Sequence, residues 1–257
     1  MPNRLIAHFL SLTLFALTCQ SENVHDDSGA LFDSSDDVMA DINETLERAR
    51  KADKLALIVV GANWCHDSRA LAARLHEEPL HSVADERFET VFVDVGFFTD
   101  GYDVLERFGS PIFYATPTVL LVDPATEQVV NATDRHMWGN ADSISMEDSV
   151  EYFSRYSSDI EYASSAGPFP EIDAYEAALA ERVRAGYTNL GPMLRAHKGG
   201  RSPPDFEEKW TELAKFRNAI PEAVIALRAQ AQAQVAAGQE VELDFPEFPE
   251  TGEFSWE

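Results

Sequence analysis

The feature that most constrains the fold is a cysteine placed where a buried strand gives way to a helix. Residues 55–60 are uniformly apolar, which is typical of a strand covered on both faces. Residues 64–68 (Trp-Cys-His-Asp-Ser) follow, and a helical stretch covers residues 69–76. A sulfur at such a joint lies at a helix N-terminus, where unpaired N–H groups and the helix dipole favour a thiolate. The pattern therefore predicts a reactive thiol at Cys65.

The elements around this joint alternate between helices and strands. Strands separated by helices pair in parallel, whereas a strand that follows a short turn pairs antiparallel. The short turn is Asp123-Pro124-Ala125-Thr126. We therefore expect a mixed sheet flanked by helices. The expected helices are 38–52, 69–76, 80–85 and 102–108, and the expected strands are 55–60, 89–95, 118–122 and 128–132.

From residue 145 onward only helices are expected. Ile172, Tyr175, Leu179 and Val183 form one apolar stripe. A second helix opens after residues 202–204 (Ser-Pro-Pro), and Pro221 is expected to start a separate Ala-rich helix that reaches residue 237. Beyond Gly238 the chain is acidic and interrupted by prolines, so we expect disorder there, with docking of its aromatic residues as the alternative. Those aromatic residues are Phe245, Phe248, Phe254 and Trp256.

The charge of the chain excludes two classes of partner. The formal net charge is -25 over 257 residues. Nucleic-acid binding depends on Lys and Arg contacts to phosphate, so no nucleic-acid partner is expected. The same argument excludes a polybasic contact with a membrane surface. Oligomeric state is left open by the composition.

The pattern of the N-terminal residues predicts an export signal. Residues 5–17 are apolar and follow a single cation, Arg4, which is the length of a signal-peptide core rather than a membrane span. Cys19 follows this run and resembles the lipidated cysteine of bacterial lipoproteins, although residues 16–18 (Ala-Leu-Thr) depart from the usual order. We expect export to the cell envelope or periplasm. The alternatives for Cys19 are lipidation, which would tether the chain to a membrane, and ordinary cleavage nearby.

Two motifs together resemble the thioredoxin superfamily. The first is Trp64-Cys65-x-x-Ser68 after a buried strand, and the second is residues 115–118 (Ala-Thr-Pro-Thr) before another strand. The resemblance implies an α/β fold, a cis peptide bond before Pro117, and pairing of an extended substrate with the backbone of Thr116. Two departures matter: Ser68 replaces the resolving cysteine, and Val59 stands where the family has a buried acid.

The resemblance also sets the expected domain organisation. A thioredoxin-like domain is expected at residues 38–140. The other expected parts are a signal peptide with a lipobox-like end at 1–19, a flexible acidic tether at 20–37, an all-helical C-terminal extension at 141–237, and an acidic tail at 238–257.

The function implied is thiol–disulfide exchange by one thiol. Cys65 would attack a protein or glutathione disulfide, and an external thiol would release the product because Ser68 cannot. The expected catalytic residues are Cys65, Ser68 and His66, and the expected substrate-binding residues are Trp64, Thr116 and Pro117. No cofactor or metal is expected. The alternative is a redox-silent binding module that captures a partner at the Thr116-Pro117 groove, with Cys65 structural and buried.

Other groups of residues give weaker evidence of a functional site. His76 lies nearly three helical turns from Cys65, so one metal ion cannot reach both. His66, Asp67 and Ser68 are neighbours in sequence, so they cannot form a hydrolase relay. Asn131-Ala132-Thr133 fits a glycosylation sequon, a pattern that is common by chance. A third role remains open for the C-terminal helices, which would cover the site and regulate it.

Overall fold

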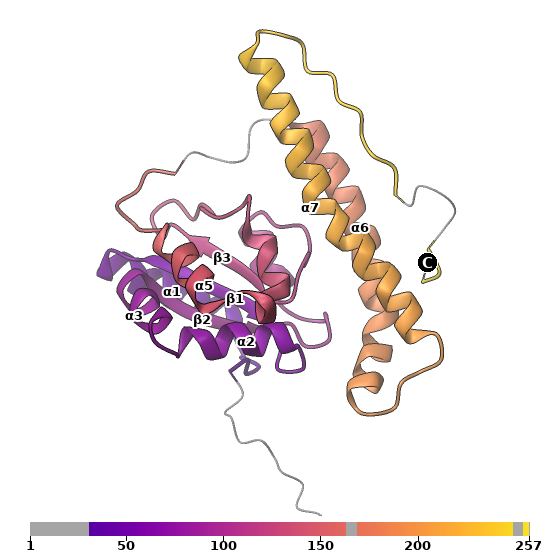
Figure 1. The fold of residues 1–257 in the computed structure, drawn as a ribbon, viewed down its shortest axis with the longest axis horizontal. Helices are drawn as coiled ribbons and strands as arrows, with labels where there is room; N and C mark the ends of the chain where they lie inside the picture. Colours follow the sequence, from indigo (N-terminus) through magenta and orange to yellow (C-terminus); the bar gives the residue numbers. More distant parts are fainter. Residues whose placement is uncertain (1–30, 163–168, 249–253, 257) are drawn as a thin grey trace, which may run out of the picture.

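The structure is a computed structural model that describes residues 31–162, 169–248 and 254–256. A three-stranded sheet with short helices around it forms one part, and two long helices lie side by side next to it (Figure 1). The elements are α1 (Val38–Ala52), β1 (Leu55–Gly61), α2 (His66–Leu75), α3 (Leu80–Arg87), β2 (Phe88–Asp94), α4 (Tyr102–Arg107), β3 (Thr118–Val122), the 3₁₀ segment η1 (Arg135–Ser143), α5 (Met146–Ser154), α6 (Pro170–Lys198) and α7 (Phe206–Ala236).

The sheet is mixed, with β1 at its centre. The strand order is β2-β1-β3, in which β1 runs parallel to β2 and antiparallel to β3. Ile58 faces Val91 on one neighbouring strand and Leu120 on the other. The predicted fold class, a mixed sheet flanked by helices with a helical C-terminal extension, is therefore confirmed.

Both faces of β1 are buried, which explains why its sequence does not alternate. Leu57 and Val59 belong to a hydrophobic cluster with side chains of α2, α3, η1 and α5. Ile58 and Val60 belong to a second cluster with side chains of α1, α4, α6 and α7. Because helices cover each face, every position of the strand can be apolar.

The expected fourth strand at 128–132 is wrong. Only an isolated bridge joins Val129 to Val122. The side chain of Asn131 takes over the edge of β3: its amide oxygen accepts from Leu121 N at 2.9 Å, and its amide nitrogen donates to Val119 O at 3.0 Å. A side-chain amide thus satisfies strand groups that a fourth strand would have paired. Asn131 is also fully buried, which speaks against its use as a glycosylation site.

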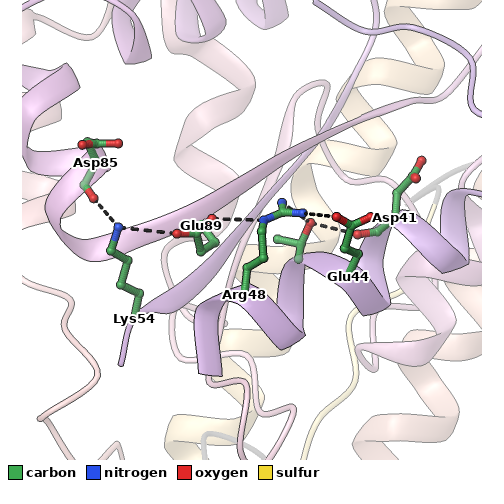
Figure 2. A network of polar contacts seen from close by, with 7 residues as sticks. Asp41, Glu44, Arg48, Lys54, Asp85 and Glu89 are labelled. Atoms are coloured by element: carbon green, nitrogen blue, oxygen red, sulfur yellow. Dashed lines mark hydrogen bonds and ion pairs between the residues drawn. The ribbon is translucent and has the colours of Figure 1, made fainter. Parts of the chain in front are cut away.

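A polar network on the surface joins α1 to the start of β2 (Figure 2). Arg48 binds Glu44 at 3.1 Å and Glu89 at 3.2 Å. Lys54 donates to the backbone oxygen of Asp85 at 2.6 Å and lies 3.5 Å from Glu89. Each exposed ion pair contributes little to the stability of the fold. Together the contacts link α1 and Lys54 to Glu89 of β2.

The C-terminal helices are longer than the sequence pattern indicated. Pro221 lies inside α7 instead of starting a new helix, and Pro192 lies inside α6. A proline inside a helix removes one backbone hydrogen bond. Pro221 is buried together with Ile220 and Val224, so tertiary packing retains the helix across it.

In its described part, the tail after Gly238 packs its aromatic side chains against the hydrophobic core, as the docking alternative supposes. The chain runs back along α7 (Figure 1). Gln234 binds both backbone groups of Glu242. Trp256 is only 3% exposed, stacks on Phe254 with ring centroids 4.8 Å apart, and accepts a hydrogen bond from Asn189 at its backbone oxygen.

The N-terminal predictions fall mostly outside the described residues. This applies to the signal peptide, to Cys19 and to residues 20–30 of the expected tether. Phe32, in the remainder of that tether, is buried and is held on both backbone groups by Asn63, so the tether does not extend this far. The expected boundary at residue 140 falls inside η1, whose Trp138 packs with the sheet.

In the described part of the chain, no helix combines the length and the apolar character that crossing a membrane requires.

Candidate functional site

Cys65 lies where the sequence predicted, at the start of α2. It is the residue before the first helical turn, its backbone is extended (φ -90°, ψ 125°), and its N–H donates to Ala62 O at 3.1 Å. Its side chain accepts no capping hydrogen bond from the N–H groups of the helix. The residue is buried, with 8% of its surface exposed.

The sheet brings Thr116 to this sulfur from 51 residues further along the chain. The S–H of Cys65 donates to the backbone oxygen of Thr116 at 3.1 Å. The peptide bond between Thr116 and Pro117 is cis, and β3 begins at the next residue. Thr118 pairs with Val60 of β1, the strand that leads into the cysteine loop. The antiparallel pairing of β1 and β3 thus places the cysteine loop, which follows β1, and the cis-proline turn, which precedes β3, at the same end of the sheet.

The turn before Pro117 is tightly fixed. The hydroxyl of Thr118 donates to Ala115 O at 2.7 Å. Gly139 lies so close to Ala115 that a Cβ atom on it would be 2.7 Å from the Ala115 methyl group. The hydroxyl of Thr116 is buried without a hydrogen-bond partner among the residues described. The backbone, rather than the Thr116 side chain, therefore makes the polar contact in this turn.

Ser68 is fully buried and faces the strand end. Its hydroxyl accepts from Ala62 N at 3.3 Å. A Cβ atom on Gly61 would lie 2.7 Å from both the Ser68 hydroxyl and the ring of Phe32, so the missing side chain makes room for them. Among the residues described, no hydrogen bond joins Ser68 to Cys65. The observed role of Ser68 is to hold the loop that carries the cysteine.

His66 and Asp67 differ in their surroundings. The His66 side chain is 68% exposed, and its Nε2 lies 3.1 Å from Asp67 Oδ2. Asp67 is buried, and its other carboxylate oxygen accepts from Asp142 N at 3.0 Å. His66 therefore lies at the surface, whereas Asp67 is buried and ties α2 to the end of η1.

Trp64 lies on the side of the site that faces α6. Its indole N–H donates to Gly96 O at 2.6 Å, and its ring stacks on Phe97 at 5.7 Å. The ammonium group of Lys198, at the end of α6, lies 5.8 Å from the ring centre. The tryptophan is half-buried, so its ring is packed rather than open on all sides. The 96–98 turn connects the site to the C-terminal helices.

Two residues of this turn were not identified from the sequence. Asp94 accepts from Gly96 N at 3.0 Å, and burial raises the pKa of its carboxyl, partly offset by that hydrogen bond. Phe98 stacks on Tyr187 of α6 at 4.0 Å, almost parallel. An acid two residues before a glycine is a recognisable turn signal, but nothing in the local pattern connects it to Trp64.

The described residues contain no group of three or more side chains suited to hold a metal ion. The rings of His76 and His81 lie 6.3 Å apart and take part in aromatic packing.

Comparisons with known proteins give one family match and one structural match. A family model described as thioredoxin-like matches residues 37–124. A solved structure, a disulphide isomerase from Xylella fastidiosa Temecula1, is 27% identical, covers 50% of this chain and 97% of its own, and has a TM-score of 0.47. No curated protein matches the chain.

Proposed function

Because residues 37–124 form a thioredoxin-like domain, we propose that the chain carries out thiol–disulfide exchange through a single thiol, Cys65. One observation carries the proposal. The sulfur lies at the N-terminus of α2 and 3.1 Å from the carbonyl that precedes a cis proline. A helix N-terminus favours negative charge on the sulfur, and the neighbouring backbone edge suits an extended substrate.

The reaction begins when the thiol loses its proton. A thiolate has no proton to donate, so the bond from Cys65 to Thr116 O must be given up. The thiolate attacks one sulfur of a disulfide: a new S–S bond forms to Cys65, the old S–S bond breaks, and the departing thiolate takes up a proton. The freed Thr116 backbone is then available to an extended peptide.

Ser68 determines how the cycle ends. It has no thiol, so it cannot attack the mixed disulfide on Cys65. An external thiol such as glutathione, or a second thiol of the bound protein, attacks instead and restores Cys65. Exchange within one client produces isomerisation without net oxidation. The substrates are therefore disulfides of proteins or of glutathione.

The remaining site residues take supporting roles. Trp64, Thr116 and Pro117 form the substrate edge, and exposed His66 follows the cysteine in sequence, with its ring 3.1 Å from the Asp67 carboxylate. Export to the cell envelope, with a lipid on Cys19 as tether, would place this chemistry in an oxidising compartment.

Trapping of adducts tests the proposal. Purified chain is incubated with glutathione disulfide and analysed by intact mass before and after reduction. We expect one reducible glutathione adduct in wild-type protein and in Cys19→Ser, and none on the domain in Cys65→Ser. Circular dichroism of Cys65→Ser checks that the fold is retained. Cys65 is the only cysteine in Cys19→Ser, so absence of the adduct from folded Cys19→Ser refutes the assignment.

The substitution Ser68→Cys tests the loop geometry. A cysteine three residues after Cys65 should form a reducible disulfide with it under oxidation. Failure to form this bond in folded protein contradicts the family geometry proposed for the loop.

A redox-silent binding module is the second candidate. The observation that favours it is the cover over the sulfur, since Cys65 is 8% exposed and its S–H is bonded. Alkylation by iodoacetamide separates the two. Reaction of folded protein supports exchange, whereas reaction only after unfolding supports capture of a partner at the Thr116-Pro117 groove.

A further inference from the structure

A cavity of about 460 Å³ lies between the sheet part and the C-terminal helices. Its walls come from the segments before and after the cis proline, from residues 132–136, and from α6 and α7. Cys65, Trp64 and Pro117 do not line it. The volume is in the range of small-molecule sites in proteins. The cavity is therefore separate from the thiol site, although Ala115 and Thr118 border both.

Arg228 supplies an unused hydrogen-bond donor to this cavity. Its Nη2 binds Asp173 at 2.6 Å and lies 3.5 Å from Glu176. Its Nη1 is buried and has no hydrogen-bond partner among the residues described. A buried donor without an acceptor is costly, so this nitrogen favours a ligand that brings an acceptor oxygen.

Arg135 lines the same cavity from η1. Among the residues described, no carboxylate lies within ion-pair distance of its guanidinium group and no acceptor binds its side chain. Burial lowers the pKa of Arg135, and the charge of Glu176 and the hydroxyl of Tyr114 partly oppose this. Glu176 supplies a nearby negative charge, but no acceptor among the residues described binds the guanidinium N–H groups, so they favour a ligand that brings acceptor oxygens.

The two arginines of the cavity wall are matched by two carboxylates. Two guanidinium groups face one carboxylate, Glu176, which also accepts a hydrogen bond from Tyr114 at 2.9 Å. Asp173 pairs with Arg228 from outside the wall, so the two guanidinium groups are balanced in formal charge by two carboxylates. The wall therefore offers a ligand unused guanidinium N–H donors rather than an excess charge, and the two oxygens of a carboxylate match such donors.

The rest of the wall is largely apolar. Ile112 comes from the segment before the cis proline, and Pro221, Val224, Ile225 and Ala229 come from α7. These side chains offer no hydrogen-bonding group to a ligand. A ligand that fills the space must therefore carry an apolar body as well as its anionic group.

We propose that this cavity binds a small monocarboxylate with an apolar body, whose carboxylate oxygens accept from Arg135 and from Nη1 of Arg228. Guanidinium groups match the planar carboxylate geometry and give charge-assisted hydrogen bonds. The apolar body lies against the α7 side of the cavity.

Isothermal titration calorimetry on the full chain tests this with octanoate as the probe. Octanol supplies the same body without the charge, and acetate supplies the charge without the body. We expect saturable binding of one octanoate per chain, with octanol and acetate each at least about tenfold weaker. Absence of saturable octanoate binding, or equal binding of octanol, overturns the proposal.

Variants locate the site. Arg135→Gln should weaken octanoate binding by about tenfold or more, whereas the matched control Arg201→Gln, on the exposed turn after α6, should leave it unchanged. Ala229→Leu fills the cavity from an exposed helix position without altering charge, and should also weaken binding. Cys65→Ser should bind octanoate as wild type does, which separates this site from the thiol chemistry. Unchanged binding in both folded Arg135→Gln and folded Ala229→Leu contradicts the assignment.

Discussion

The sheet part of the molecule, residues 31–162, and the pair of helices α6 and α7 differ in how their structure is specified. In the sheet part, turns, glycines and apolar runs mark the ends of short elements, and β3 has the bounds that its sequence predicts. In the helix pair, Pro192 and Pro221 have the appearance of breaks but lie inside continuous helices. Local signals thus decide short elements, whereas packing along a long apolar face can override them.

The two parts also contribute differently to the thiol site and to the cavity. The thiol and its cis-proline turn are held entirely by the sheet part. The helix pair contacts this site at several places: Phe98 of the 96–98 turn stacks on Tyr187, the ammonium group of Lys198 lies 5.8 Å from the Trp64 ring centre, and the Tyr187 hydroxyl donates to Phe113 O at 2.7 Å. The cavity with the two arginines, by contrast, needs both parts. We therefore expect substitutions on the Leu57 face of the sheet to affect mainly the sheet part, whereas those on the Ile58 face, which shares a core with α6 and α7, affect both parts.

The largest change in the free energy of unfolding is expected from a substitution in the sheet core. Leu57 is fully buried in β1, and Leu57→Ala should lower the free energy of unfolding by about 2–5 kcal/mol through lost burial and a cavity. Val235→Ala, at an exposed position of α7, should change it by less than about 0.5 kcal/mol. Urea titration measures both.

The distribution of the Leu57→Ala effect tests whether the parts are separate. Hydrogen exchange should show greater loss of protection in β1 than in α7. Equal loss in both would mean that sheet and helix pair unfold as one unit.

An intermediate change in the free energy of unfolding is expected from a substitution where α6 contacts the 96–98 turn of the sheet part. A Cβ atom on Gly191 of α6 would lie 2.7 Å from Phe97 O, so Gly191→Ala must displace the 96–98 turn. We expect a loss of about 1–3 kcal/mol, and faster alkylation of Cys65 because Trp64 loses part of its support. Gly199→Ala, at the end of the same helix with ordinary φ and an uncrowded Cβ position, is the matched control. Unchanged alkylation in Gly191→Ala would show that α6 does not influence the thiol.

The smallest change in the free energy of unfolding is expected from breaking an ion pair on the surface of the sheet part. Arg107 binds both carboxylate oxygens of Glu127 at 2.9 Å, which lowers the pKa of Glu127 below its usual range. Glu127→Gln should cost at most about 1 kcal/mol, because the pair is partly exposed. Glu181→Gln, at an exposed position of α6, serves as control.

The pH dependence of this pair has a definite sign. A carboxyl with a lowered folded-state pKa stabilises the protein above its unfolded-state pKa, and this contribution is lost as pH falls through the folded-state pKa. The stability difference between wild-type protein and Glu127→Gln should therefore be present at neutral pH and vanish in acid. A difference that grows as pH falls would contradict the pairing.

The sequence by itself determined the central part of this protein. An apolar strand, a Trp-Cys turn, a helix, and a Thr-Pro step before a second strand depend on neighbours within a few residues, so the thioredoxin-like domain and its cysteine were predictable. The sequence also placed Cys65 and Thr116 as one site by resemblance, and their contact is observed.

Only the tertiary structure decided the features that join distant segments. Asn131 replaces a strand at the edge of β3, Asp67 is buried against Asp142, and Trp256 docks on the helix pair. Arg135 and Arg228, 93 positions apart in the sequence, face one cavity. Such partners are chosen by which surfaces meet when the sheet part and the helices pack, and short-range patterns of hydrophobicity and charge do not encode that choice.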